Sequence, residues 1–304
     1  MNDLDIAHAI EANVAAALAE DLGVSLSLTL SLGEREKHFA AALSRDLTAQ
    51  LIPAERTARA MLIAREEAVL CGIPWFEACF KALDPQAQVT WLAKEGERIP
   101  ADAMLCEING NARAILSAER PALNFLQLLS GTATVTRRYV DAVAGTKAMI
   151  MDTRKTLPGL RVAQKYAVKI GGGENQRIGL FDGILIKENH IAAAGGIRAA
   201  LAAARQQGTP GVSIQIEVES LAELEEALDA SANLILLDNF DTKQMREAVR
   251  ITAQRAALEA SGGIAFDTVR AIAETGVDRI SIGGLTKHVR AVDLSLRIQA
   301  NRKA

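Results

Sequence analysis

A basic stretch from residue 152 to residue 190 combines side chains that bind anions with three consecutive glycines. It reads DTRKTLPGLRVAQKYAVKIGGGENQRIGLFDGILIKENH. Guanidinium groups match carboxylates and phosphates with two parallel hydrogen bonds, and lysine supplies a point charge. The set is therefore suited to a ligand with several negative charges. Its basic residues are Arg154, Lys155, Arg161, Lys165, Lys169, Arg177 and Lys187.

Two short apolar runs accompany this basic stretch: residues 148–151 come directly before it, and residues 183–186 lie near its end. Their length and the helical spacing of apolar residues between them predict successive parallel strands of a βαβ unit. The functional edge of such a unit is at the carboxyl ends of its strands. We therefore expect Arg154, Lys155 and Lys187 to converge on one rim.

The segment between the runs contains a turn, a helix and a glycine cluster. Pro158 and Gly159 favour the turn, and apolar residues at helical spacing predict a helix over 160–170. Gly171–Gly173 ends that helix and lets backbone N–H groups approach a ligand closely. A flexible cap on a solvated basic helix is the alternative interpretation of the three glycines.

Three motifs carry a resemblance to a known family. D-T-R-K-T-x-P-G-L-R at 152–161, G-G-G-x-N-x-R-x-G-L at 171–180 and I-K-E-N-H at 186–190 closely resemble quinolinate phosphoribosyltransferases, also called nicotinate-nucleotide pyrophosphorylases (carboxylating). The resemblance extends along nearly the whole chain. It departs at Gln176, where the family usually has histidine.

The resemblance implies a pentosyltransferase of NAD biosynthesis. Such an enzyme transfers the phosphoribosyl group of 5-phosphoribosyl-1-pyrophosphate to quinolinate with decarboxylation, and yields nicotinate mononucleotide, CO₂ and pyrophosphate. It also implies a homodimer that uses Mg²⁺ and no organic cofactor.

Composition predicts a soluble protein with a well-formed core. The chain has 304 residues, 49% of them hydrophobic, which predicts a well-formed core and two domains. A net charge of −3 argues against nucleic acid as the partner. Three cysteines without a CxxC motif suggest neither a disulfide framework nor a zinc site, and fit a reducing cytoplasm. The acidic start and the lack of a long apolar run argue against a signal peptide and a membrane span.

The first part of the chain predicts an α+β domain with an antiparallel sheet. Strand signals broken by turns, with one or two helices, fill residues 48–110. We assign this N-terminal domain to residues 1–119, with the tail 287–304 packing back on it.

An amphipathic helix is expected at 6–22, ahead of a stretch that the family lacks. Alternating Ser/Thr and Leu predicts a strand at 25–32, and a charged, Ala-rich sequence predicts a helix at 34–44. Residues 24–45 therefore look like an insertion, for which the sequence indicates no function.

The second part of the chain alternates apolar runs with helical stretches. This pattern is typical of a barrel-like α/β domain, and about six runs are fewer than the eight strands of a complete TIM barrel. The resemblance likewise implies an incomplete α/β barrel, which we assign to residues 120–286. The runs are 148–151, 183–186, 213–218, 234–237, 256–258 and 279–282, and the helical stretches are 197–206, 221–230, 242–252 and 266–275.

Carboxylates end two of these runs. Gln215, Glu217 and Glu219 alternate with apolar residues, so one strand face carries both glutamates, and Asp238 ends the next run. Glu217 and Asp238 are candidate ligands for a Mg²⁺ ion that also binds substrate phosphates. The alternative is that Glu217 or Glu219 pairs with a lysine or arginine of the rim.

Glycine loops follow the last two runs. Gly262 and Gly263 follow Ser261, and Gly283 and Gly284 precede Leu285. Such loops after the final strands of an α/β barrel often hold phosphate with backbone N–H groups. The family assigns these loops to the ribose 5′-phosphate, and two tight turns are the alternative.

The remaining roles come from the resemblance. It implies that Arg154, Arg177, Lys187 and the partner subunit's Arg120 hold quinolinate, with Thr153 as a further donor and Lys155 on the pyrophosphate side. Pro121 belongs in the first turn of a helix, so Arg120 is expected at a helix start. The catalytic set is Lys155, Lys187, Glu217 and Asp238.

Position 176 and two histidines of this chain receive separate interpretations. Gln176 can donate hydrogen bonds but stays neutral, so we expect it to bind a substrate carboxylate more weakly than histidine. His190 is expected to stabilise the loop after its strand, and His288 is a weaker candidate for the site.

Three rival functions remain open at this point. One is a phosphoribosyltransferase for another acid or heterocycle that does not decarboxylate its substrate. The second is a Schiff-base lyase with Lys187 as nucleophile. The third is a non-catalytic phosphosugar-binding paralogue, which the Gln176 substitution suggests.

Overall fold

The structure, a computed structural model, describes residues 3–25, 38–39, 41–207 and 211–299. They form two compact units. The first contains the described residues of Met1–Thr134, Pro158–Gly171 and Val289–Ala304, and the second contains those of Val135–Leu157 and Gly172–His288. This division differs from the predicted one after residue 119, because the chain enters and leaves the first unit more than once.

The first unit contains the predicted antiparallel sheet. Its strand order is β12-β1-β5-β3, and every neighbouring pair is antiparallel. The tail thus returns to this unit, as β12 beside β1. Alternate residues of β1 are buried, which is the period expected of a strand with one face on a core. The strands are β1 (Thr57–Ala64), β3 (Gln88–Trp91), β5 (Met104–Asn111) and β12 (Leu294–Ile298), and β2 (Ala68–Val69) pairs with β4 (Arg98–Ile99).

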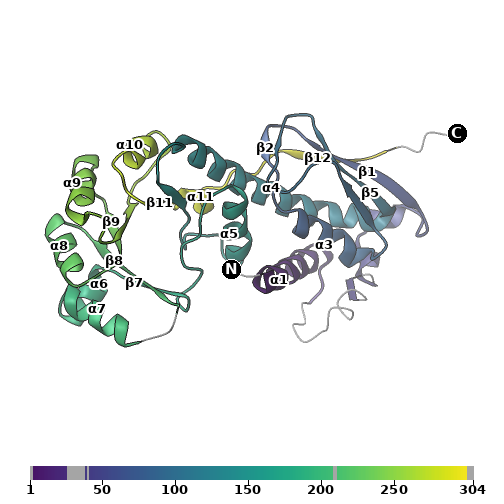
Figure 1. Cartoon of the computed structure of the whole chain (residues 1–304). Helices are drawn as coiled ribbons and strands as arrows, with labels where there is room; N and C mark the ends of the chain where they lie inside the picture. The colour runs from purple at the N-terminus through teal and green to yellow at the C-terminus, as the bar shows by residue number, and fades with distance from the viewer. Residues whose placement is uncertain (1–2, 26–37, 40, 208–210, 300–304) are drawn as a thin grey trace. The chain divides into compact units, whose positions relative to one another are not determined.

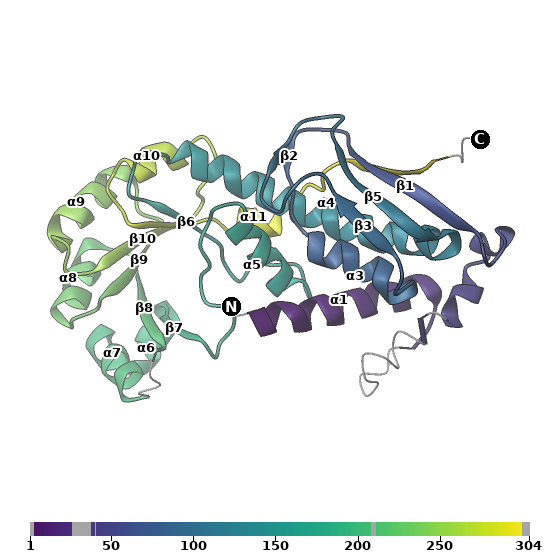
Figure 2. The ribbon, with the colours of Figure 1, turned by 45° about the vertical axis from the view of Figure 1, so that its right-hand side comes forward.

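Helices cover the core of the first unit. Helix α1 (Asp3–Leu22) lies beside α3 (Ile73–Leu83) and also packs on α5 (Arg161–Ile170), as Figure 2 shows. Trp75 is fully buried and packs at a tilt against Tyr166, so it is a core residue. Two 3-10 turns, η1 (Leu43–Arg45) and η2 (Ala49–Leu51), precede the sheet.

The long helix α4 (Ala112–Ala142) corrects one prediction. Pro121 lies inside this helix and does not begin it. A proline in a helix interior removes one backbone hydrogen bond and costs about 3 kcal/mol. Buried neighbours, among them Ala118 and Ala122, offset this cost through packing. Arg120 therefore lies mid-helix, away from any array of free N–H groups.

Two predictions fall on the apparent insertion. The expected strand at 25–32 lies outside the described residues, apart from residue 25, and so does the first part of the expected helix at 34–44. Turn η1 occupies the end of that stretch.

The second unit contains a six-stranded sheet of order β6-β11-β10-β9-β8-β7, in which all pairs are parallel. β6 and β7 are parallel, as predicted, but they form the two edges of the sheet. The helix between them in sequence, α5, belongs to the first unit. The strands are β6 (Met149–Met151), β7 (Gly183–Ile186), β8 (Ser213–Val218), β9 (Leu234–Asp238), β10 (Ala257–Ser261) and β11 (Arg279–Ser281).

Helices α7 to α10 lie along one side of these strands (Figure 1). Ser220 caps α8 by accepting from the Glu223 N–H, and Asp241 forms a capping box with Gln244 on α9. No helix in the described part of the chain is both long and apolar enough to cross a bilayer. The helices are α6 (Glu188–Ala194), α7 (Ile197–Gln206), α8 (Leu221–Asp229), α9 (Thr242–Thr252), α10 (Val269–Ala273) and α11 (Gly284–Lys287).

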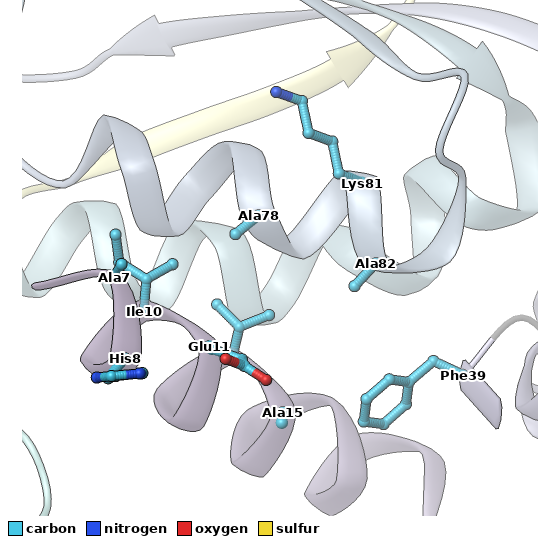
Figure 3. A pocket seen from close by; sticks show the side chains of 10 residues that line it. Ala7, His8, Ile10, Glu11, Ala15, Phe39, Ala78, Lys81 and Ala82 are labelled. Carbon is cyan, nitrogen blue, oxygen red and sulfur yellow. The ribbon is translucent and has the colours of Figure 1, made fainter. Parts of the chain in front are cut away.

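The first unit also has a groove of about 510 Å³ between α1 and α3, shown in Figure 3. Apolar side chains such as Ile10, Ala78 and Phe39 form most of its wall. Glu11 and Lys81 are its charged members. We refer to it as the α1–α3 groove.

Candidate active site

A cavity of about 310 Å³ in the second unit gathers most of the predicted site residues. We call it the cationic cavity. Eight of its eleven lining residues are predicted ones, and Leu185, Leu236 and Ser281 are the three that sequence reasoning missed. The predicted ones are Thr153, Arg154, Lys155, Gln176, Arg177, Lys187, Glu217 and Ser261.

Strand register explains why these side chains meet. Glu217 pairs with Leu236 in the neighbouring strand, so both lie on the same face of the sheet. Asp238 lies two residues beyond Leu236 and therefore shares that face. Lys187 lies two residues beyond Leu185, which pairs with Gln215 on the same face. One face of the sheet thus presents cations and carboxylates together at the carboxyl ends of its strands.

Arg154 and Arg177 bring two guanidinium groups to one cavity. Burial lowers the pKa of Arg177, and the positive charge of Arg154 lowers it further. Arg177 Nη1 donates to the Gly183 carbonyl at 2.9 Å. Gly183 makes this approach possible, because a Cβ there would lie 3.0 Å from the Cβ of Arg177. An anion between the two arginines would relieve their repulsion.

Lys187 and Glu217 form an ion pair. Lys187 Nζ lies 2.8 Å from Glu217 Oε2, and the two side chains are 44% and 8% exposed. The pairing of Glu217 with a rim lysine, an alternative left open by the sequence, is thus present in this structure. Glu219 is exposed, and its N–H donates to Glu223 at the start of α8. Glu219 is therefore not part of the cavity.

The backbone of Lys155 is fixed from two directions. Its N–H donates to Thr153 Oγ1 at 3.0 Å, and its carbonyl accepts from the hydroxyl of buried Thr286 at 2.9 Å. Gly283 packs against its side chain, since a Cβ on Gly283 would lie 2.9 Å from Lys155 Cδ. The segment around Gly283, Gly284 and Leu285 thus supports Lys155, although none of the three lines the cavity.

Asn239 connects Asp238 to the first glycine loop. Its backbone is left-handed at φ 56°, and its side chain donates to Asp238 Oδ2 at 2.9 Å. Its N–H donates to the Ser261 carbonyl at 3.0 Å. Gly262 has φ +100°, and a side chain there would collide with Asn239. Such backbone strain is common at functional sites.

The loop before β7 is fastened to β6 by a buried carboxylate. Asp152 is fully buried and accepts from Asn175 Nδ2 at 2.6 Å and from the Gln176 N–H at 2.8 Å. A parallel bridge joins Met151 to Glu174. The backbone of Gln176 is therefore held in place beside the cavity.

A second buried carboxylate lies behind the cavity wall. Glu259 in β10 is fully buried and accepts hydrogen bonds from Gln215 Nε2 at 3.0 Å, from Gln176 Nε2 and from the Ser281 hydroxyl. Glu259 is not among the residues that the sequence analysis assigned to the site. The period-two pattern of the neighbouring strands was the signal that could have placed it on the cavity face.

Some predicted residues lie elsewhere. Arg120 is in the first unit, exposed on α4, where its charge lowers the pKa of Asp21 against the stronger, raising effect of burial. His190 Nδ1 accepts from the Lys187 N–H at 3.0 Å, which confirms its structural role in that loop. His288 is exposed at the end of α11 and does not line the cavity.

The carboxylates offer a partial ligand set for a metal. No group of three or more His, Cys, Asp or Glu residues suited to a metal occurs within the ranges that the structure describes. Mg²⁺ is often held by only one or two carboxylates, with waters and substrate phosphates as the other ligands. Glu217 and Asp238, on one face of adjacent strands, fit that mode.

These features define a class of protein. A cavity at the carboxyl edge of a parallel sheet, lined by two arginines, two lysines and one carboxylate, is a site for a small molecule with several negative charges.

Comparison with known proteins identifies the family. Residues 46–130 match the family model of the quinolinate phosphoribosyl transferase N-terminal domain, and residues 132–297 match that of its C-terminal domain. The chain belongs to the quinolinate phosphoribosyltransferase family.

Individual relatives match over most of their length. The probable nicotinate-nucleotide pyrophosphorylase [carboxylating] of Bacillus subtilis is 40% identical over 85% of this chain and 90% of its own. The Mycobacterium leprae enzyme of that name is 42% identical over 83% and 90%. The solved structure of the nicotinate-nucleotide pyrophosphorylase from Francisella tularensis has a TM-score of 0.81 and 45% identity, covering 89% of this chain and 98% of that one.

Proposed function

We propose that the protein transfers a phosphoribosyl group from 5-phosphoribosyl-1-pyrophosphate to quinolinate and releases CO₂ and pyrophosphate, giving nicotinate mononucleotide. The observation that carries this proposal is the convergence of Arg154, Lys155, Arg177 and Lys187 on one cavity in a chain of this family. Quinolinate is a pyridine with two adjacent carboxylates, and its cosubstrate carries a pyrophosphate and a phosphate. Both ligands require several cations.

The two arginines suit the acid. Arg154 and Arg177 can each grip a carboxylate with two hydrogen bonds, and Lys187 adds charge after exchanging its contact with Glu217. Thr153 is a further donor at the same wall. In a homodimer, the partner subunit's Arg120 would supply another cation from the exposed face of α4.

The phosphoribosyl donor occupies the other side of the cavity in this proposal. Lys155 meets the pyrophosphate. The backbone around Ser261, Gly262 and Gly263, together with that around Gly283, Gly284 and Leu285, holds the 5′-phosphate. The support of Lys155 by Gly283 agrees with a shared role of these two segments.

Glu217 and Asp238 would hold Mg²⁺ together with the pyrophosphate of the donor. The ion would neutralise charge on the leaving group. We further propose that the parallel sheet forms an incomplete α/β barrel and that the protein works in a reducing cytoplasm, which its three unpaired, buried thiols support.

The chain's contribution to the chemistry is charge and position. Arg154 and Arg177 hold the acid so that its ring nitrogen faces C1 of the ribose, and Lys155 stabilises the charge of the departing pyrophosphate. The nitrogen bonds to C1 as the C1–O bond breaks. When the 2-carboxylate leaves as CO₂, the electron pair of the broken bond stays on C2, where the adjacent positively charged nitrogen stabilises it, and C2 then gains a proton. No side chain acts as a nucleophile in this sequence.

Parallel assays with two acids test the proposal. Purified protein, Mg²⁺ and phosphoribosyl pyrophosphate are mixed with quinolinate or with nicotinate, and CO₂ and nicotinate mononucleotide are measured together. We expect equal amounts of both products from quinolinate and none from nicotinate. Transfer to nicotinate without CO₂ would assign a non-decarboxylating transferase, and silence with both acids would contradict the enzyme proposal.

A further inference from the structure

Glu259 is a buried carboxylate for which the proposed chemistry has no use. It lies in β10 and has no exposed surface, and it is absent from the lining of the cationic cavity. A buried carboxylate is strongly destabilising unless donors surround it. Here the donors come from three other segments: β8, β11 and the loop before β7. Such a cross-sheet arrangement is expected where a buried group must hold several segments in place.

The Glu259 carboxylate determines the orientation of the side-chain amides of Gln215 and Gln176. An ionised carboxylate only accepts hydrogen bonds, so it draws the nitrogen of each neighbouring amide toward itself. Gln215 Nε2 donates to Glu259 Oε2, which leaves Gln215 Oε1 to accept from Gln176 Nε2 at 3.4 Å. Gln176 Nε2 donates to Glu259 Oε1 as well. Both hydrogens of the Gln176 amide are thereby directed into the protein.

Residue 176 is thus held through both its backbone and its side chain. Asp152 accepts from its backbone N–H, and Glu259 accepts from its side chain. The next residue is Arg177, which lines the cavity beside Arg154. Two buried carboxylates, Asp152 directly after β6 and Glu259 in β10, therefore fix the residue that precedes a principal cation of the cavity.

We propose that Glu259 is a positioning residue for the acid side of the cavity. Through the Gln176 amide it sets the loop that carries Arg177, and it turns the donors of Gln176 away from the bound acid. This inference rests on the proposed function. In it, Gln176 acts as a connection between Glu259 and Arg177, in place of the direct carboxylate ligand that the sequence suggested.

The substitution Glu259→Gln is the sharpest test, because it keeps the size of the side chain and removes its charge. The amide nitrogen of the new glutamine would then face one of the three hydrogen-bond donors, and that hydrogen bond would be lost. Losing a hydrogen bond to a charged group should weaken quinolinate binding about tenfold to a hundredfold. We expect KM for phosphoribosyl pyrophosphate to stay within about twofold, since Glu259 accepts from Gln215, Gln176 and Ser281, and none of these is assigned to that substrate.

Gln176→His provides the second arm. An imidazole can donate one N–H to Glu259 and present its other nitrogen to the cavity, where it gains a charge as pH falls below about 6.5. We expect Q176H to bind quinolinate more tightly than the wild type at pH 6 and not at pH 8. In the E259Q background this pH-dependent gain should be lost, which a double-mutant cycle measures.

Asp278→Asn is the matched control, because Asp278 is another carboxylate near strands β10 and β11. Asp278 accepts from the Leu258 N–H at 2.8 Å and pairs with Lys147 at 2.7 Å, and it does not line the cavity. D278N should lower the melting temperature and leave quinolinate binding unchanged. A merely structural Glu259 would make E259Q behave in the same way.

Binding and turnover are measured separately, by calorimetric titration with quinolinate and by the two-product assay. Absence of turnover in the wild type would contradict the proposed function. Wild-type turnover together with unchanged quinolinate binding in E259Q would overturn the positioning role. So would an equal pH-dependent gain from Q176H in both backgrounds.

Discussion

Two hollows among the described residues have opposite character. The α1–α3 groove measures about 510 Å³ and is mostly apolar, whereas the cationic cavity measures about 310 Å³ and is lined by two arginines and two lysines. Size alone would select the groove. The chemistry selects the smaller cavity, because cationic side chains from several strand ends and loops converge there.

The charged groups of the two units also differ in what they accomplish. In the first unit Glu95 accepts from the N–H groups of Gly72 and Ile73 at the start of α3, so its charge serves the fold. In the cationic cavity Arg154 and Arg177 repel each other. Like charges kept together reduce stability, and binding an anion relieves this cost.

Arg177→Met should give the largest effect and sharpen this contrast. Losing a guanidinium that grips a carboxylate should reduce kcat/KM for quinolinate by about a hundredfold to a thousandfold. The melting temperature should stay level or rise, because a desolvated charge repelled by Arg154 is removed. Steady-state kinetics measure kcat/KM for quinolinate, and calorimetry measures the melting temperature. A large drop in melting temperature with unchanged kinetics would make Arg177 a structural residue.

Gly283→Ala should act on the other side of the cavity. The new methyl group would lie 2.9 Å from Lys155 Cδ and displace that side chain. We expect KM for phosphoribosyl pyrophosphate to rise about tenfold, the size of one weakened charged contact. In a Lys155→Ala background the same glycine substitution should add little, because the displaced group is gone. Equal effects in both backgrounds would contradict the contact.

Asp46→Ala should affect stability and leave binding unchanged. Burial raises the pKa of Asp46, but hydrogen bonds from the Ala49 N–H, the Ser117 hydroxyl and the Thr48 N–H outweigh it, and the pKa is lowered. Losing these hydrogen bonds should cost about 1 kcal/mol in the free energy of unfolding.

The pH dependence of that loss follows from the lowered pKa. A depressed carboxyl pKa stabilises the fold above about pH 4 and less as pH falls through the folded-state value. The free energies of unfolding of D46A and wild type, measured in urea, should therefore differ by the full amount at pH 7 and converge at low pH. A constant difference at all pH values would contradict the role of the charge.

Ala82→Leu, in the wall of the α1–α3 groove, should have the smallest effect. Added apolar contact should raise the free energy of unfolding by up to about 1 kcal/mol. Both kinetic constants should equal those of the wild type, because the groove is not the catalytic site. A change in the KM for quinolinate would contradict the conclusion that the α1–α3 groove is not the catalytic site.

Sequence reasoning located the cavity because its residues follow strand ends and lie in compact motifs. The bounds of β7, β8, α7 and α9 agree with the apolar periodicity. It missed the continuity of α4, because a proline usually marks a helix start and only buried packing overrides that preference.

Long-range relations were beyond the sequence signal. The Glu259 network joins residues of four separate segments, and only strand register brings them together. The same holds for β6 and β7, whose apolar runs predict parallel strands without indicating that they form opposite edges. Local periodicity specifies each element, and the order of strands depends on contacts far apart in the chain.

The pairing of β12 with β1 has a consequence for synthesis of the chain. Leu62 pairs with Leu296, so the first sheet is completed by a strand that follows the whole second unit. During translation β1 can pair with β5 early, but its other edge stays open until β12 emerges. An open strand edge is a template for association with other chains. The first unit therefore keeps one edge of β1 unpaired until nearly the whole chain has been synthesised.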